Sequence, residues 1–179
     1  MKVFSANYLD MLTTQAQVSP RKRQHRNIHE NYEDPCQRLF NAIELGSYIR
    51  PHKHATDPRD ELLVAVRGVM VLMTFDDRGK VKEVVHFGSD RCNEDLAVGV
   101  EVQAGTWHTV FALTSGCVLL EVKAGPFDPS QPKDLAPWAP AEDAATAEQY
   151  LQDMISRVNS FQCQVAVTHM PTNIDHFWD

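Results

Sequence analysis

The chain has 179 residues, of which 43% are hydrophobic and 23% charged, and its formal net charge at pH 7 is -7. This size and composition are typical of a single compact core with an appendage, and the acidic balance disfavours a nucleic-acid partner. No apolar stretch is long enough for a signal peptide or a membrane span, so we expect a cytoplasmic protein without membrane insertion.

The N-terminal region, residues 1–38, is predicted to form a helix followed by a basic arm. Leu9, Leu12 and Ala16 recur at spacings of three and four, which indicates a short helix within residues 3–18. Residues 21–29 are the only dense basic segment of the chain. This arm is either a solvated face without a specific role or a strap over a cavity that supplies cations to an anionic substrate.

Residues 39–128 show short apolar runs separated by turn residues, a pattern typical of β-strands. About eight strands in about 85 residues, with no helical pattern between them, favour an antiparallel sandwich or barrel of the jelly-roll type. The predicted strands are 39–45, 47–49, 62–67, 69–75, 82–87, 96–102, 107–112 and 117–123.

The C-terminal region, residues 129–179, is predicted to be an extension of this barrel. Four prolines disfavour regular structure in a Pro-rich wrap, residues 129–140, which should cross the surface. An amphipathic helix is predicted from Glu142, and residues 161–167 alternate as a short final strand would. We expect this extension to pack on the barrel or on a second subunit, and we expect a homodimer.

Three histidines and one glutamate have the spacing of a metal site. His52 and His54 lie two residues apart, so on a strand their side chains share one face with Cα atoms about 6.6 Å apart. Glu61 opens one apolar strand, and His108 starts another after a Gly-Thr turn. Three imidazoles and a carboxylate suit one divalent transition metal, either Fe, Zn, Mn or Ni.

Four more residues are candidates for a catalytic role beside the metal. Arg50 shares a face with the histidine pair if the strand alternation continues through Pro51. Glu121 and Lys123 share one face of the last barrel strand, and a charged pair there indicates either a polar cavity or a solvated rim. Tyr48 is a candidate acid–base group.

The proposed ligands lie in segments that resemble the two motifs of the cupin family. The resemblance implies a mainly β double-stranded β-helix, the jelly-roll cupin barrel, with the four ligands named above. Two features depart from the motifs: the loop between His54 and Glu61 is longer, and Gln103 and Ala112 replace a proline and an asparagine. The matching residues are Gly46, His52, His54, Glu61, Gly68, Gly105 and His108.

About residues 5–142 more closely resemble the WbuC-type cupin metalloproteins, which are associated with bacterial surface-polysaccharide (O-antigen, lipopolysaccharide) gene clusters. This association favours an enzyme that acts on a carbohydrate or nucleotide-sugar intermediate. Zn, Mn or Ni at the four ligands would polarise a carbonyl, which supports isomerisation or epimerisation as the reaction. The resemblance also favours a substrate-binding role for the arm. The matching segments are 19–23, 27–29, 50–54, 105–109, 121–126 and 136–140, and the implied substrate-binding residues are Arg21, Arg23, His25, Asn27 and His29.

Two other functions remain open at this stage. With Fe(II), the same four ligands suit a small-molecule dioxygenase, because two coordination positions stay free for oxygen and substrate. A non-catalytic metal-dependent sugar-binding or regulatory module is expected if no proton-transfer group lies near those positions. Turnover of sugar nucleotides and consumption of oxygen would distinguish the three functions.

Overall fold

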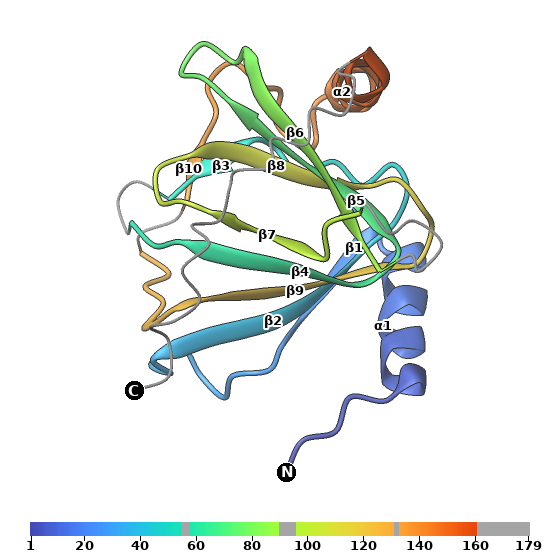
Figure 1. Ribbon diagram of the computed structural model, residues 1–179, viewed down its shortest axis with the longest axis vertical. Coiled ribbons are helices and arrows are strands. Elements are labelled where there is room, and N and C mark those ends of the chain that lie inside the picture. The colour runs from blue at the N-terminus through green and yellow to red at the C-terminus, as the bar shows by residue number, and fades with distance from the viewer. Residues whose placement is uncertain (55–57, 90–95, 131–132, 161–179) are drawn as a thin grey trace, which may run out of the picture.

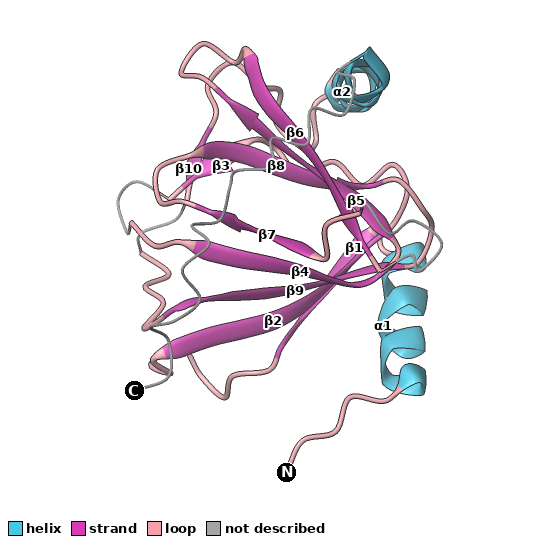
Figure 2. Cartoon of the chain, viewed as in Figure 1, coloured by secondary structure: helices cyan, strands magenta, loops and turns pink. Residues whose placement is uncertain are grey.

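The computed structural model describes residues 1–54, 58–89, 96–130 and 133–160. In these ranges ten strands form two five-stranded sheets that face each other, and a helix lies on the outside of each sheet (Figure 1 and Figure 2). Neither described helix is long and apolar enough to cross a membrane.

The first sheet has the strand order β1-β2-β9-β4-β7, and every neighbouring pair is antiparallel. Its strands are β1 (Arg23–Asn27), β2 (Cys36–Ile43), β9 (Cys117–Ala124), β4 (Glu61–Arg67) and β7 (Gly99–Val102). The second sheet has the order β10-β3-β8-β5-β6 and is also antiparallel throughout. Its strands are β10 (Asp134–Leu135), β3 (His52–Lys53), β8 (Trp107–Ala112), β5 (Val69–Phe75) and β6 (Val81–Gly88).

Apolar side chains of both sheets meet in a core between them. Ile43 and Leu119 of the first sheet are buried in one cluster with Met70, Phe87 and Val110 of the second. Because strands neighbouring in a sheet come from distant parts of the chain, this arrangement is a jelly roll rather than a simple meander. The predicted fold class, a mainly β jelly-roll barrel with an N-terminal and a C-terminal helix, is confirmed.

Helix α1 (Ala6–Val18) covers the outer face of the first sheet. The Ser5 hydroxyl accepts a hydrogen bond from the backbone N–H of Tyr8 (3.2 Å) and caps the helix, which explains its start. The predicted stripe of Leu9, Leu12 and Ala16 is buried against outward-facing side chains of β2 and β9. Burial of this stripe is what fixes the helix on the sheet.

Helix α2 (Ala147–Ser160) covers the outer face of the second sheet. Its side chains Leu151 and Met154 pack on Met73 and Phe75 of β5. Strand β5 is therefore covered on both faces, which explains why its sequence is apolar except for Thr74 rather than alternating. The helix begins five residues later than the sequence predicts.

The Pro-rich wrap fastens the segment that precedes β3. Strand β10, which belongs to the wrap, pairs with β3. The hydroxyl of Tyr48 donates to the carbonyl of Pro140 (3.0 Å), and the guanidinium of Arg50 donates twice to the carbonyl of Ala136 (3.1 and 2.6 Å). These contacts hold the backbone that leads into His52.

Several strand boundaries differ from the sequence predictions. The basic arm is itself a strand, β1, which pairs with β2 at the edge of the first sheet. Residues 47–49, predicted as a strand, are irregular, and the strand lies instead at β3. The predicted final strand, 161–167, lies outside the described residues.

Candidate metal centre

A cavity of about 650 Å³ opens between the two sheets, lined by inward-facing side chains. Its polar end is built on one row of the first sheet, in which Gln37, Lys123 and Glu61 are direct cross-strand partners on β2, β9 and β4. Side chains of Ile49, Val110 and other apolar residues form part of its remaining walls. A cavity of this size is typical of a small-molecule site.

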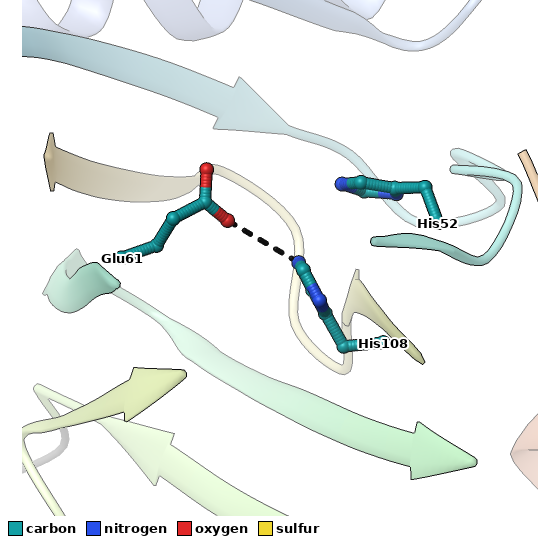
Figure 3. Close-up of side chains that lie close together, drawn as sticks. All are labelled: His52, Glu61 and His108. Atoms are coloured by element: carbon teal, nitrogen blue, oxygen red, sulfur yellow. Dashed lines mark ion pairs between the residues drawn. The ribbon is translucent and has the colours of Figure 1, made fainter. Parts of the chain in front are cut away.

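His52, Glu61 and His108 converge at the polar end from both sheets (Figure 3). His52 on β3 and His108 on β8 are direct cross-strand partners, whereas Glu61 comes from β4 of the opposite sheet. One ligand atom from each residue lies within 4.8 Å of the others, and all three residues are less than 9% exposed. This group is placed to bind a single metal ion.

Backbone carbonyls orient both histidine rings. The Nδ1 atom of His52 lies 3.0 Å from the carbonyl oxygen of Arg50, and the Nδ1 atom of His108 lies 2.8 Å from that of Thr106. A carbonyl accepts only from N–H, so each Nδ1 carries a proton, and Nε2 is the ring nitrogen that can serve as a metal ligand once it carries none. Burial, with smaller contributions from Lys133 and His108, lowers the pKa of His52 well below its ordinary value, which keeps the ring neutral.

Glu61 is an ionised carboxylate that contacts several donors. One oxygen, Oε1, lies 3.1 Å from His54 Nε2 and 2.9 Å from Lys123 Nζ, and the other, Oε2, lies 3.3 Å from His108 Nε2. Burial alone would raise the pKa of Glu61, but hydrogen bonds from His108 and His54 and the charge of Lys123 bring it well below its ordinary value.

The donor chemistry of these residues fits a divalent transition metal. Two imidazoles and one ionised carboxylate are buried together, which is a donor set that suits a metal ion of this class. His54, the fourth predicted ligand, is outside the group that lies within 4.8 Å, but its Nε2 contacts Glu61.

Glu121 and Lys123 line the same cavity and do not lie on a solvated rim. The ammonium of Lys123 donates to Glu61 Oε1 and to Glu121 Oε1, at 2.9 Å each. Burial lowers the pKa of Lys123, but the two carboxylates outweigh it and the net pKa is raised. The polar cavity is thus the reason for this charged pair in the barrel interior.

The basic arm forms one wall of the cavity. Alternation along β1 turns the side chains of Arg23, His25 and Asn27 to the same face, and Arg21 and His29 line the cavity beyond the two ends of the strand. His29 is buried, and its Nδ1 is held at the backbone of Arg38. All five residues implied as substrate-binding are therefore brought together.

Tyr48 and Arg50 do not belong to the described residues that line the cavity. Tyr48 is buried against α2 on the outer face of the second sheet, and the Arg50 side chain binds the Pro-rich wrap. Residues 48–51 are irregular, so strand alternation does not predict where these side chains point. Arg50 instead affects the site through its carbonyl, which orients His52.

Several lining residues, among them Gln37, Asn41 and Lys133, were not singled out from the sequence. Gln37 and Asn41 share the parity of Leu39 on β2, so the strand pattern could have found them once that strand was known to face the cavity. Lys133 comes from the Pro-rich wrap, whose path no sequence pattern indicates.

Comparisons with known proteins agree with the fold. A family model described as a domain of unknown function, DUF6016, matches residues 4–87. No protein with a curated description matches significantly. An X-ray structure of a Shewanella oneidensis protein is 9% identical, with a TM-score of 0.50 over 62% of this chain and 72% of that one. At this identity the likeness is one of fold alone.

Two further solved structures are also similar. A cupin 2 conserved barrel domain protein from Rhodopseudomonas palustris is 15% identical, with a TM-score of 0.46 over 78% of each chain. KdgF from Halomonas sp. is 14% identical, with a TM-score of 0.45 over 63% of this chain and 86% of that one.

Proposed function

We propose that this protein is a metal-dependent cupin enzyme that isomerises or epimerises a carbohydrate or nucleotide-sugar intermediate of bacterial surface polysaccharide (O-antigen) biosynthesis in the cytoplasm. The observation that carries the proposal is the buried group of His52, Glu61 and His108 at one end of a cavity whose wall is cationic. The resemblance to WbuC-type cupins supports the pathway and the class of substrate.

The chemistry of such a reaction divides between the metal and the residues around it. His52, Glu61 and His108, with His54 beside them, would hold a divalent ion, which would supply Lewis-acid polarisation of a substrate carbonyl. Glu121 lines the same cavity, so its carboxylate is placed to take a proton from a substrate carbon and return it. Lys123 holds Glu121 in position through its 2.9 Å hydrogen bond.

Lys123 acts as a fixed positive charge in this scheme. Its raised pKa keeps the ammonium protonated near neutral pH, so it stabilises negative charge rather than exchanging protons. The same ammonium orients Glu61, and it therefore links the ligand carboxylate to the proposed base.

The remaining walls suit an anionic sugar derivative. Arg23 and His25 on β1 supply cationic and hydrogen-bonding groups for an anionic part and for hydroxyls, and apolar side chains such as Val110 and Leu119 suit the face of a sugar ring. The proposed partner of the protein is accordingly a small anionic molecule.

The first experiment is elemental analysis of the purified protein beside a His52→Ala, His108→Ala double variant. We expect about one equivalent of a transition metal in the parent protein and its loss in the variant, because two of the three clustered ligands are removed. A parent protein that stays metal-free after reconstitution would refute the metal-dependent function.

Turnover is then measured by NMR with candidate sugar nucleotides on the metal-loaded protein. Glu121→Gln should abolish proton exchange at the substrate carbon, whereas Glu101→Gln, an exposed control on β7, should leave it unchanged. Oxygen consumption with Fe(II) would instead indicate a dioxygenase. Metal-dependent sugar binding without turnover would indicate a binding module.

A further inference from the structure

Two guanidinium groups meet on a single carboxylate oxygen at the edge of the cavity. Arg21 donates from Nε (3.0 Å) and Nη2 (2.8 Å) to Oε2 of Glu142, and Arg23 donates from Nη2 to the same oxygen. Three charge-assisted hydrogen bonds to one oxygen form a cradle for an oxyanion.

The two arginines belong to the cavity, but the carboxylate does not. Arg21 and Arg23 are among its lining residues, whereas Glu142 comes from the segment that joins the Pro-rich wrap to α2. The side chain of Arg23 is only 10% exposed and is fixed by a second bond, from Nη1 to the carbonyl of Tyr48 (2.8 Å). One half of the cradle is therefore rigid and remains in place when the carboxylate leaves.

The Glu142 carboxylate is more exposed to solvent than Arg23, so it can leave the cradle more readily than Arg23 can. Its side chain is 29% exposed, and that of Arg21 is 64% exposed. Burial raises the pKa of Glu142, but hydrogen bonding to Arg23 and the charges of both arginines outweigh this and lower it. Glu142 thus presents a true anion to the cradle at neutral pH.

The cradle and Glu61 are built on different backbone rows of the first sheet. On β2, Arg23 is opposite Ile43, whereas the row that leads through Lys123 to Glu61 begins at Gln37. Six residues of strand separate these rows, which is about 20 Å of strand length. Lys133 also lines the cavity and interacts electrostatically with Glu142 and Arg23 as well as with Glu61, so the side chains of the two ends approach one another more closely than the backbone rows do. A ligand with a sugar at one end and an anion at the other would contact both.

We propose that Arg21 and Arg23 form a binding subsite for a phosphoryl group of the substrate, and that Glu142 occupies this subsite until the substrate displaces it. The inference rests on the proposed function and specifies its substrate as a phosphorylated, extended sugar derivative. A phosphoryl group offers several oxygens and more negative charge than a carboxylate, so it matches two converging guanidinium groups better. A weakly anionic ligand would then not displace Glu142 from the subsite.

The subsite is tested by calorimetric titration of the full-length, metal-free protein with inorganic pyrophosphate. Glu142→Gln removes the competing anion and should bind pyrophosphate about tenfold more tightly than the parent. Arg21→Ala should bind about tenfold more weakly, since it loses a charge-assisted contact. The matched control is Arg26→Ala, which removes the same charge from the exposed side of β1, where Arg26 contacts Gln15 (3.3 Å), and should bind within twofold of the parent.

Two results would overturn the inference. One is a Glu142→Gln variant that binds pyrophosphate no better than the parent while its melting temperature shows it to be folded. The other is an equal loss of affinity in Arg21→Ala and Arg26→Ala, which would mean that only the overall charge of the protein affects pyrophosphate binding. If Glu142→Gln fails to fold, the comparison of these two arginine variants still tests the inference. Because no metal is present, failure of the proposed reaction would not affect the titration, and failure of the titration would leave the metal centre untouched.

Discussion

Replacement of Lys123 by methionine tests whether the charges of the cavity are balanced as the structure indicates. The ammonium lies 2.9 Å from one carboxylate oxygen of Glu61 and 2.9 Å from one of Glu121, and the three side chains are 15%, 5% and 18% exposed. Methionine has a similar length and no charge, so the substitution leaves two carboxylates in the barrel interior without their shared cation.

The expected loss of stability is large for a single substitution. At an effective dielectric constant of 20, each contact at this distance corresponds to about 6 kcal/mol of Coulomb attraction. Much of this is offset because the methionine side chain avoids the desolvation of an ammonium, and removal of one partner of a buried ion pair costs about 3–5 kcal/mol in practice. We therefore expect the free energy of unfolding of the metal-free protein to fall by about 3 kcal/mol.

Urea unfolding at pH 7.5, followed by tryptophan fluorescence, measures this loss. The double variant Lys123→Met, Glu121→Gln should recover about half of the lost free energy of unfolding, because one of the two unpaired carboxylates is replaced by a neutral amide. Lys82→Met, an exposed control on β6, should stay within about 0.5 kcal/mol of the parent. A Lys123→Met protein as stable as this control would refute the reasoning.

Three further predictions concern other parts of the molecule. Gly79→Ala should lower the free energy of unfolding by about 2 kcal/mol or more, because the φ of +80° is unfavourable for alanine and the added Cβ would lie 2.6 Å from Trp138. Gly116→Ala should lower it by only about 1 kcal/mol, because Gly116 has a similar φ of +72° but no atom within 4 Å of the added Cβ. Equal losses in urea unfolding would contradict this prediction. Because the pKa of Glu142 is lowered in the folded protein, its ion pairs contribute stability above its unfolded pKa, near 4.5, and this contribution is lost as the pH falls through the lower folded pKa. The stability difference between the parent and Glu142→Gln should therefore be constant near neutral pH and vanish in acid. A difference that grows in acid would contradict the ion pairing of Glu142. Size-exclusion chromatography with light scattering should give twice the 20.2 kDa chain mass for the proposed homodimer, and a single species of 20.2 kDa would exclude it.

Much of the fold could be predicted because the strand pattern is local. The apolar runs at β4, β5 and β8 and the stripe of α1 each identify an element from a few neighbouring residues. The basic arm could not be recognised as a strand in the same way, because β1 is a polar edge strand stabilised by pairing with β2. Its structure depends on a contact with another part of the chain rather than on its own pattern.

The parts of the candidate site that depend on local sequence patterns could also be predicted. Alternation placed Glu121 and Lys123 on one face, and the ligand motif identified His52 and His108. Alternation does not apply to the irregular segment before β3, so it could not show that Arg50 reaches the Pro-rich wrap. Nor could it show that Glu142 lies against the arginines, since that contact spans about 120 residues of chain.

The polar cavity and the apolar core share the space between the two sheets, but the groups proposed to react are not the ones that pack. Ile43, Met70 and Phe87 join the sheets by apolar packing and do not line the cavity, whereas Glu61, Glu121 and Lys123 line it with charge. Substitutions among these charged side chains can therefore alter the chemistry while the apolar packing between the sheets is kept. The barrel is in this sense a scaffold on which related chains could carry out different reactions, each determined by a few side chains that line the cavity.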